Sequence, residues 1–422
     1  MSALKWAQQA TFDVLVVGGR PAGASLAARL GAAGVRVLIV DKARFPSRPA
    51  VSAPFVLPHA LGLLDELGVS ERDYARDTPR LSHYVLEYGN HFRARLGFTQ
   101  PIAGRDYFYA VERSRFDACL WDNLSRFPNV LALSQVHAHD LLRDASGRVC
   151  GVLASADGEP HPVPLRAACV VGADGRHSLI ARKLGLSPSE QRFDVDTSLH
   201  YAHWQNVGPL ADEAAPVAHI HSAGDGFGIV FMPSADGETM VLAQGRSDRY
   251  DAGLASPQAR YEAVLRARPS LWQRLAHAKQ VSKLHGMKRL GNLFRPACGP
   301  GWALVGDAYH QKDSIDAQGI YDALLGARVL AQMLIAWQRG EVGLSQALED
   351  YRRAIYTELK PMFDFTLSRV KRELYGSPPP PVVARSVLRW IVTSEAYGKN
   401  FGALVTRRLA PEQLMRPRAM LG

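Results

Sequence analysis

The chain has 422 residues, of which 47% are hydrophobic, so it is long enough for a large core and for two or three domains. Its formal net charge is +10, but the basic residues form no long run, which argues against a nucleic-acid-binding protein. We expect no membrane-spanning segment and no secretion signal, and the four widely spaced cysteines fit a reducing, cytoplasmic location.

The N-terminal part predicts a βαβ unit that binds a nucleotide. Residues 13–17 form a short apolar run that is typical of a buried parallel strand, and Pro21 suits the first turn of a following helix. A pyrophosphate would bind N–H groups at this helix N-terminus, and Asp41, which ends the next strand, would accept hydrogen bonds from ribose hydroxyls. The turn itself contains Gly18, Gly19, Arg20, Ala22 and Gly23.

One residue of this turn departs from the G-x-G-x-x-G pattern. Arg20 replaces the middle glycine, and its side chain would obstruct the backbone approach to a phosphate unless it turns outward. An outward guanidinium can itself pair with a phosphate. A crossover of the same kind that binds no nucleotide is the alternative interpretation.

The rest of the chain predicts further strands and helices. The patterns indicate, in order, a loop from Lys42 to Ala53 over the nucleotide, a helix at 59–67, strands within 81–109, a helix at 113–127, short strands at 130–171, an antiparallel sheet at 194–246, and helices at 257–277 and 318–338. Helical sequence then continues to about residue 374. The prolines at 378–381 should be extended, and a last helical section follows them.

Two further stretches run from a buried strand into a turn that carries glycine and a carboxylate. Residues 168–182 include Asp174 and Gly175, and residues 301–308 include Gly306 and Asp307. Because the carboxyl ends of parallel strands share one edge of an open sheet, we expect these turns to meet the first one where ligands bind.

Together the three turns resemble the para-hydroxybenzoate hydroxylase superfamily of FAD-dependent monooxygenases, which includes geranylgeranyl reductases. Residues 174–178 with Arg182 are similar to its D-G-x-x-S-x-x-R motif, residues 306–308 to its G-D motif, and Arg113 with Asp117 to its R-x-x-L-D-x-x-L helix. The G-G-R-P-A-G turn and Gln318-Gly319-Ile320 resemble a bacterial branch of FAD-dependent oxidoreductases.

The resemblance implies an α/β fold of three parts. A glutathione-reductase-type, Rossmann-like FAD domain would comprise residues 11–80, 111–190 and 286–340. An inserted antiparallel β-sheet substrate domain would comprise residues 81–110 and 191–285. Residues 341–422 would form a helical C-terminal region with a polyproline break at 378–381.

The resemblance also implies roles for single residues around FAD. Gly18, Arg20 and Gly23 would surround the pyrophosphate, supported by Asp174, and Asp307 would bind the ribityl chain. Arg113 would lie near the linker of the cofactor and Arg182 near the approach of the nicotinamide, although either could form an ordinary surface ion pair. The helix that begins at Gln318, Gly319 and Ile320 would direct its N–H groups at the flavin. Before it, Ser314–Gly319 departs from P-x-x-G-Q-G, and Asp316 introduces a charge there.

The implied chemistry is hydroxylation of an aromatic or polyketide-like molecule. NADPH or NADH, used transiently, or a partner reductase would reduce the flavin, and molecular oxygen would react through a flavin hydroperoxide. The alternatives are a reductase of isoprenoid or other C=C bonds, with peripheral membrane association through residues 385–391, and, more weakly, a halogenase. An FAD-binding regulatory protein without turnover is a further alternative.

Candidate catalytic and pocket residues come from the predicted substrate sheet. His203 and His310 are the candidate catalytic residues, because both are expected near the pocket. The candidate pocket residues are Tyr201, His203, Trp204, His219, His221 and Phe231. Trp204 and Phe231 could equally fill the core. We expect no metal site, because no carboxylate or cysteine stands at ligand spacing from the histidines.

Overall fold

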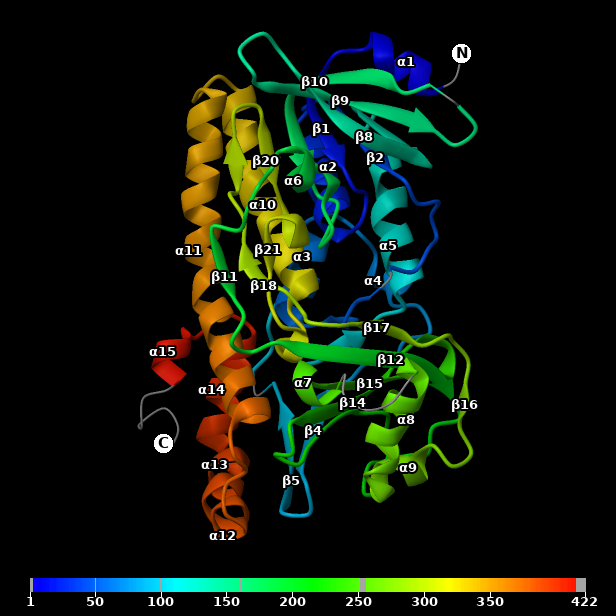
Figure 1. The fold of residues 1–422 in the computed structure, drawn as a ribbon, viewed down its shortest axis with the longest axis vertical. Helices are drawn as coiled ribbons and strands as arrows, with labels where there is room; N and C mark the ends of the chain where they lie inside the picture. The colour runs from blue at the N-terminus through cyan, green and yellow to red at the C-terminus, as the bar shows by residue number, and fades with distance from the viewer. Residues whose placement is uncertain (1–2, 50, 99, 160, 251–255, 415–422) are drawn as a thin grey trace.

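The computed structural model describes residues 3–49, 51–98, 100–159, 161–250 and 256–414. Two large sheets lie one above the other along the long axis, and helix α11 runs beside both (Figure 1). The fold is mixed α/β. The last residues of the predicted C-terminal region, 415–422, lie outside the described residues.

The first sheet contains the predicted nucleotide-binding strands. Parallel pairing joins β20, β10, β1, β2 and β7 in that order, and β8 and β9 continue the sheet as an antiparallel meander from β10. The central strands are buried on both faces, as their Val, Ile and Leu runs predict. The strands are β1 (Phe12–Val17), β2 (Val37–Asp41), β7 (Val130–Ser134), β8 (Val136–Arg143), β9 (Val149–Ala156), β10 (Val163–Gly172), β19 (Cys298–Gly299) and β20 (Trp302–Leu304).

Helix α2 (Pro21–Ala32) packs on this sheet and against α10 (Gly319–Gln338), which in turn contacts α11 (Leu344–Val370). Among the described residues, α10 is the one helix long and apolar enough to cross a membrane. Most of its apolar window is buried inside the protein, as in the core helix of a globular fold.

The second sheet has the order β16-β12-β15-β14-β13-β4-β5, with β17 also paired to β12. Most pairs are antiparallel, as predicted, but β13 runs parallel to β4. Helices α8 (Pro257–Arg266) and α9 (Pro269–Arg274) lie beside this sheet (Figure 1). The strands are β4 (His83–Tyr88), β5 (Phe92–Gly97), β12 (Thr197–Gln205), β13 (Ala218–Ser222), β14 (Phe227–Pro233), β15 (Thr239–Arg246), β16 (Lys279–Gln280) and β17 (His285–Met287).

The C-terminal region is helical, and Pro361 lies within α11. The polyproline break is present, but Pro381 opens α12 and is not extended as predicted, because a proline fits the first turn of a helix. The helices beyond α11 are α12 (Pro381–Val383), α13 (Arg389–Thr393), α14 (Glu395–Val405) and α15 (Pro411–Leu414).

Short elements connect these parts. They are α1 (Ala3–Gln9), β3 (Phe55–Val56), α3 (Pro58–Asp65), α4 (Glu71–Tyr74), β6 (Tyr109–Ala110), α5 (Arg113–Asp122), α6 (Leu179–Lys183), β11 (Glu190–Arg192), α7 (Ser247–Tyr250), β18 (Asn292–Phe294) and β21 (His310–Gln311).

Candidate active site

The three glycine turns lie together at the carboxyl edge of the first sheet. A Cβ atom on Gly18 would stand 2.4 Å from the carbonyl oxygen of Ala173, and one on Gly306 would stand 2.9 Å from the Cβ of Ala22. A Cβ on Gly23 would stand 1.8 Å from the carbonyl oxygen of Gly18. These glycines are therefore required for backbone packing between the turns, and the predicted meeting of the three turns is confirmed.

Two long helices direct uncapped N-termini at this edge region. No side chain caps α2, whose N-cap residue is Arg20, or α10, whose N-cap residue is Gln318. Their first N–H groups and the positive ends of their dipoles are available to anionic groups. By contrast, Asp174 accepts from the Ser178 hydroxyl at 2.6 Å and from the Leu179 amide at 2.7 Å, so its carboxylate holds the short helix α6. Burial raises the pKa of Asp174.

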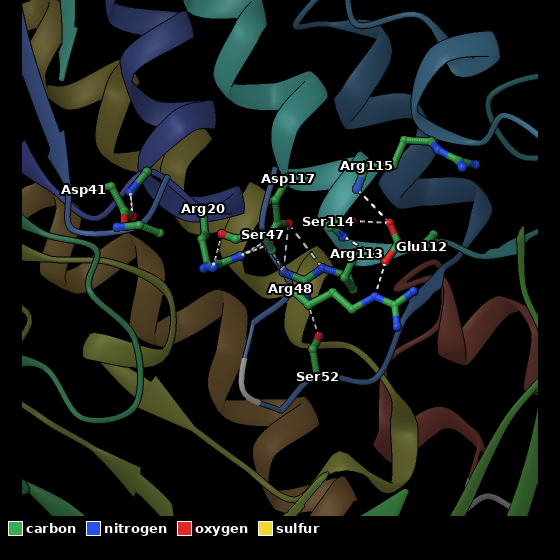
Figure 2. Close-up of polar contacts among 12 residues, drawn as sticks. Arg20, Asp41, Ser47, Arg48, Ser52, Glu112, Arg113, Ser114, Arg115 and Asp117 are labelled. Carbon is green, nitrogen blue, oxygen red and sulfur yellow. Dashed lines mark hydrogen bonds and ion pairs between the residues drawn. The ribbon is translucent and has the colours of Figure 1, made fainter. Parts of the chain in front are cut away.

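Arg20 turns away from the phosphate approach and joins a buried charge cluster (Figure 2). Its Nη1 lies 2.5 Å from Oδ2 of Asp117, and Nη2 of Arg113 lies 2.9 Å from Oδ1 of the same carboxylate. Asp117 is fully buried, and Arg20 also donates to the Ser47 hydroxyl at 3.1 Å. Two guanidiniums on one carboxylate leave an excess positive charge beside the N-terminus of α2, where an anion would be favoured.

This cluster answers two questions that the sequence left open. The side chain that replaces the middle glycine does not block the helix N-terminus, and Arg113 is buried with Asp117 and hydrogen-bonds Ser52, so it forms no ordinary surface ion pair. Asp117 was not among the predicted site residues, although its i,i+4 spacing from Arg113 is the signal that could have found it.

Asp41 closes the turn from the other side. Its Oδ2 accepts from the Gly19 amide at 2.6 Å, and Trp121 packs so close that a Cβ on Gly19 would stand 2.2 Å from its ring. Phe45 stacks on Trp121 with ring centroids 4.7 Å apart. The predicted ribose ligand therefore also fixes the turn, and an aromatic pair that sequence reasoning missed lies beside it. Lys42 is exposed next to Asp41.

The turn at 174–178 brings a second cationic side chain, Arg176, to the G-D turn. Nε of Arg176 lies 3.0 Å from Oδ2 of Asp307, and Nη1 of Arg176 is buried without a partner in the described part of the chain. A buried donor without an acceptor is costly, so this atom suits a phosphate or ribityl oxygen. Gly175, which precedes Arg176 in the same turn, has a left-handed φ of +78°. Arg182 is exposed and donates to the carbonyl of His177 at 3.3 Å.

The first turn of α10 is tied to the C-terminal region. Gln318 donates from Nε2 to the carbonyl of Val405 at 2.8 Å and accepts from Arg407 at 2.8 Å. Asp322 binds Arg407 at 2.6 Å and also Lys312, which is buried. The two cations exceed the single carboxylate, so positive charge accumulates near the end of α10 that was predicted to face the flavin. Gly319 begins the helix, and Ile320 is buried in the core.

The loop before α10 shows how its departures from the family pattern are accommodated. Asp316 is ion-paired with Arg369 at 2.5 Å and accepts from the Thr366 hydroxyl at 2.6 Å, so its charge is compensated by α11. Ala317 adopts a left-handed φ of +51° at the position where the family has glycine. The backbone turn is thus kept at the cost of strain.

The substrate sheet divides the predicted pocket residues between its two faces. Tyr201 packs in the cluster that contains Phe55 and Met240, whereas Trp204 donates to the Tyr261 hydroxyl at 3.1 Å under α8. His219 stacks on Phe231, and its Nε2 lies 2.9 Å from Glu87. Trp204, His219 and Phe231 therefore fill the far face of the sheet and line none of the described cavities, because side chains alternate along a strand.

His203 borders a cavity of about 20 Å³ with Arg48 and Arg113. Its Nδ1 lies 3.1 Å from Oε2 of Glu238, and burial lowers the pKa of His203 to about 4. His221 borders another cavity, of about 80 Å³, that shares Phe55 and Ile220 with the large cavity described below.

His310 lies between aromatic side chains instead of in a pocket. Its ring centroid is 4.5 Å from that of Phe294 and 5.7 Å from that of Phe363, and burial lowers its pKa to about 3. It lines none of the described cavities, and its ring packs in the core, so its predicted place beside a pocket stays a prediction that this geometry does not support.

A much larger cavity than these two, of about 520 Å³, lies elsewhere on the second sheet. It is bounded by strands β4, β5 and β13, the loop at 315–317, α11 and the C-terminal helices. None of the predicted pocket residues lines it, because its walls come from segments far apart in the sequence. Within the described ranges, no group of three or more His, Cys, Asp or Glu residues could hold a metal ion.

Comparison with known proteins identifies the family of the chain. The family described as "FAD binding domain" matches residues 11–359. The chain belongs to this FAD-binding family. It is an FAD-dependent oxidoreductase, and the uncapped helices, the glycine turns and the unpaired donor of Arg176 fit a dinucleotide.

Individual relatives have different activities. The chain is 28% identical over 335 residues to the ubiquinone hydroxylase UbiL of Rhodospirillum rubrum, covering 78% of this chain and 73% of that one. It is 22% identical to a digeranylgeranylglycerophospholipid reductase of Methanothrix thermoacetophila, covering 90% and 95%. The fold is similar to that of the flavin-dependent brominase Bmp2, with a TM-score of 0.79, 18% identity and 94% of each chain covered.

Proposed function

We propose that this protein is an NAD(P)H-dependent monooxygenase that hydroxylates an aromatic or polyketide-like small molecule. The observation that carries the proposal is the position of the loop at 314–319. This loop leads into the uncapped helix α10 and also borders the large cavity, so a flavin at α10 would adjoin space for a substrate. The similarity to a ubiquinone hydroxylase supports hydroxylation.

The proposal includes a glutathione-reductase-type FAD domain with the second sheet inserted as a substrate domain. The parallel strands with the β8–β9 meander support the first part, and the separate sheet with its own cavity supports the second. We propose the domain boundaries that the family resemblance implies, with residues 341–422 as a helical C-terminal region.

The chain's own residues would bind the cofactor and protect the reaction. Gly18, Gly23 and the N-terminus of α2 would hold the pyrophosphate, favoured by the excess positive charge of the Arg20 cluster, Asp41 would bind the adenosine ribose, and Arg176 with Asp307 the ribityl chain. Bound FAD would accept hydride from NADPH or NADH and activate molecular oxygen. The apolar walls of the cavity would exclude water, and exposed Arg182 would be accessible to a nicotinamide nucleotide.

Among the histidines, His203 is the proposed proton acceptor; it borders the small cavity and not the large one, but its strand neighbour Tyr201 packs in the same cluster as Tyr84 and Leu96, which line the large cavity. Its lowered pKa keeps the imidazole neutral at physiological pH, so the ring can accept a proton, and Oε2 of Glu238, 3.1 Å from Nδ1, is close enough to stabilise the imidazolium that forms. His310 receives no role in this proposal.

The test is the visible spectrum of the purified protein, followed without oxygen as NADPH and then NADH is added. A bound flavin that bleaches, and labelled dioxygen that enters a product, are the expected results. Bleaching only with an added reductase would replace direct NAD(P)H use by a partner reductase. A protein that neither contains nor takes up FAD would overturn the proposal.

A second candidate is an FAD-dependent reductase of an isoprenoid or other C=C bond. It is favoured by the outer side of the C-terminal segment, where Val382, Val387 and Trp390 are exposed beside Arg385. Such an apolar and basic surface suits peripheral contact with a membrane that holds an isoprenoid. Consumption of the double bond without incorporation of labelled oxygen would select this candidate over hydroxylation.

A further inference from the structure

The large cavity joins three parts of the molecule that are distant in sequence. One wall comes from Ile315 and Ala317, in the loop before α10, and a second from Leu86 and Ile220, on the inner strands of the second sheet. The third wall belongs to the C-terminal segment and includes Leu388, Ile391, Tyr397 and Phe401. A volume of about 520 Å³ is within the range of about 300–1,000 Å³ that is usual for small-molecule sites.

The lining offers no free charge to bind an ionised substrate at its centre. Arg369 pairs with Asp316 at 2.5 Å and with Glu373 at 2.8 Å, and Arg372 beside Glu373 supplies the second positive charge, so two cations balance two carboxylates. Arg372 is largely exposed and lies 3.9 Å from Glu373. Most other lining side chains are aliphatic or aromatic, with the hydroxyls of three tyrosines among them. Such walls favour a neutral, apolar ligand, because an unpaired charge would lose its hydration there.

The C-terminal wall lies outside the segment that the FAD-binding family shares. The family match ends at residue 359, whereas α13 and α14 span Arg389–Thr393 and Glu395–Val405. This wall is nevertheless firmly attached to the flavin side, because Gln318 binds the carbonyl of Val405 and Asp322 binds Arg407. A segment outside the family match is thus held at a fixed distance from the first turn of α10.

We propose that this cavity is the substrate site, that it takes a neutral, extended apolar molecule, and that residues 388–401 determine its specificity. The proposal deepens the proposed oxidoreductase function. It rests on that function for the identification of the end of the cavity next to α10 as the place where the substrate reacts. Polycyclic aromatic molecules and isoprenoid chains share the required chemistry. Small ionised phenolic acids do not, because they would leave much of the cavity unfilled and their carboxylate unpaired.

The test uses the FAD-loaded protein and Nile red, a neutral planar dye that fluoresces in apolar surroundings. Ile391→Trp would fill the cavity from α13, whereas Val387→Trp would place the same ring on the exposed side of the same segment. We expect Ile391→Trp to weaken Nile red binding at least about tenfold, because the indole ring occupies space that the dye needs. Val387→Trp should leave binding unchanged.

Further arms identify the ligand class and guard against misfolding. Ile391→Ala enlarges the cavity at the same wall. It should change which competing ligand displaces the dye best, without loss of the flavin spectrum. Displacement of Nile red by geranylgeraniol supports an isoprenoid chain, and displacement by anthraquinone supports a polycycle. Equal effects of the two tryptophan variants, or 4-hydroxybenzoate displacing the dye as well as the larger competitors do, would overturn the proposal.

The outcome is separable from that of the proposed function. Flavin reduction by NADPH reports on the oxidoreductase, whereas dye binding needs neither reductant nor oxygen. Normal flavin reduction with a dye site insensitive to Ile391→Trp would overturn this inference alone. A dye site that behaves as expected in a protein whose flavin no reductant reduces would overturn the proposed function alone.

Discussion

The sheet edge and the large cavity are built by different means. At the sheet edge, three positions require glycine. A Cβ on Gly18 or Gly23 would stand within 3 Å of a backbone carbonyl oxygen, and a Cβ on Gly306 would stand within 3 Å of the Ala22 side chain. The cavity is instead shaped by large aliphatic and aromatic side chains from both halves of the molecule. A cofactor shared by a whole family can be held by backbone geometry, whereas a particular substrate has to be recognised by side chains.

The largest effect should come from Gly23→Ala, which disturbs the backbone packing at the sheet edge. The added methyl would stand 1.8 Å from the carbonyl oxygen of Gly18, so the turn must open. We expect loss of bound FAD and destabilisation by more than about 3 kcal/mol, measured by flavin absorbance and denaturant unfolding. Gly398→Ala, where nothing lies within 4 Å, is the control, and equal behaviour of the two would contradict the packing argument.

The next effect concerns the charge cluster beside α2. Asp117→Asn would leave Arg20 and Arg113 facing each other without a buried anion. Breaking a buried ion pair costs about 3–5 kcal/mol. We therefore expect the free energy of unfolding to fall by about 3 kcal/mol and FAD to be retained less tightly. Asp122→Asn, on the exposed side of the same helix, should change neither quantity. Unchanged unfolding of Asp117→Asn would show that the cluster contributes nothing.

Acid should destabilise the protein through its buried histidines. The folded pKa of His310, about 3, lies below its ordinary value of 6.5, so the unfolded chain binds the extra proton first. The contribution to stability is complete above pH 6.5 and declines as pH falls toward 3. Linkage gives a loss of about 2 kcal/mol by about pH 5 from this one residue.

The variant His310→Leu should therefore show a shallower loss of stability between neutral and acid pH. The charged groups that face this ring, Lys312, Asp322, Arg407 and Arg176, remain in place in the variant. Unfolding curves measured across the pH range test this, with the exposed His161→Leu as the control. Parallel pH profiles for wild type and His310→Leu would contradict the assignment.

The smallest effect should be a gain in stability. Ala317→Gly relieves a left-handed residue in the loop that borders both the predicted flavin position and the cavity. Left-handed strain costs a residue with a Cβ about 1–2 kcal/mol, and part of this returns because glycine is more flexible when unfolded. We expect stabilisation by about 0.5–1 kcal/mol in thermal unfolding. Ala336→Gly within α10 should destabilise by about 1 kcal/mol.

How far sequence reasoning reached depends on how local each signal was. The strand, turn and helix of the N-terminal unit, the convergence of the three turns and the mixed α/β fold were predicted correctly, because each depends on short apolar runs and on glycines at fixed spacing. The sequence showed that Arg20 would obstruct the phosphate unless it turned outward, but its partner Asp117, which decides this, lies 97 residues away and was not identified.

The sequence by itself determined the parallel strands, the glycine turns and the cofactor class, since these follow from backbone conformation and periodicity along one stretch of chain. Only the tertiary structure decided which face of the second sheet meets the cavity, and it placed Trp204, His219 and Phe231 away from it. The same is true of the C-terminal wall, where Arg407 reaches Asp322 across 85 residues. Such contacts depend on how separate segments pack, which no local pattern of residues specifies.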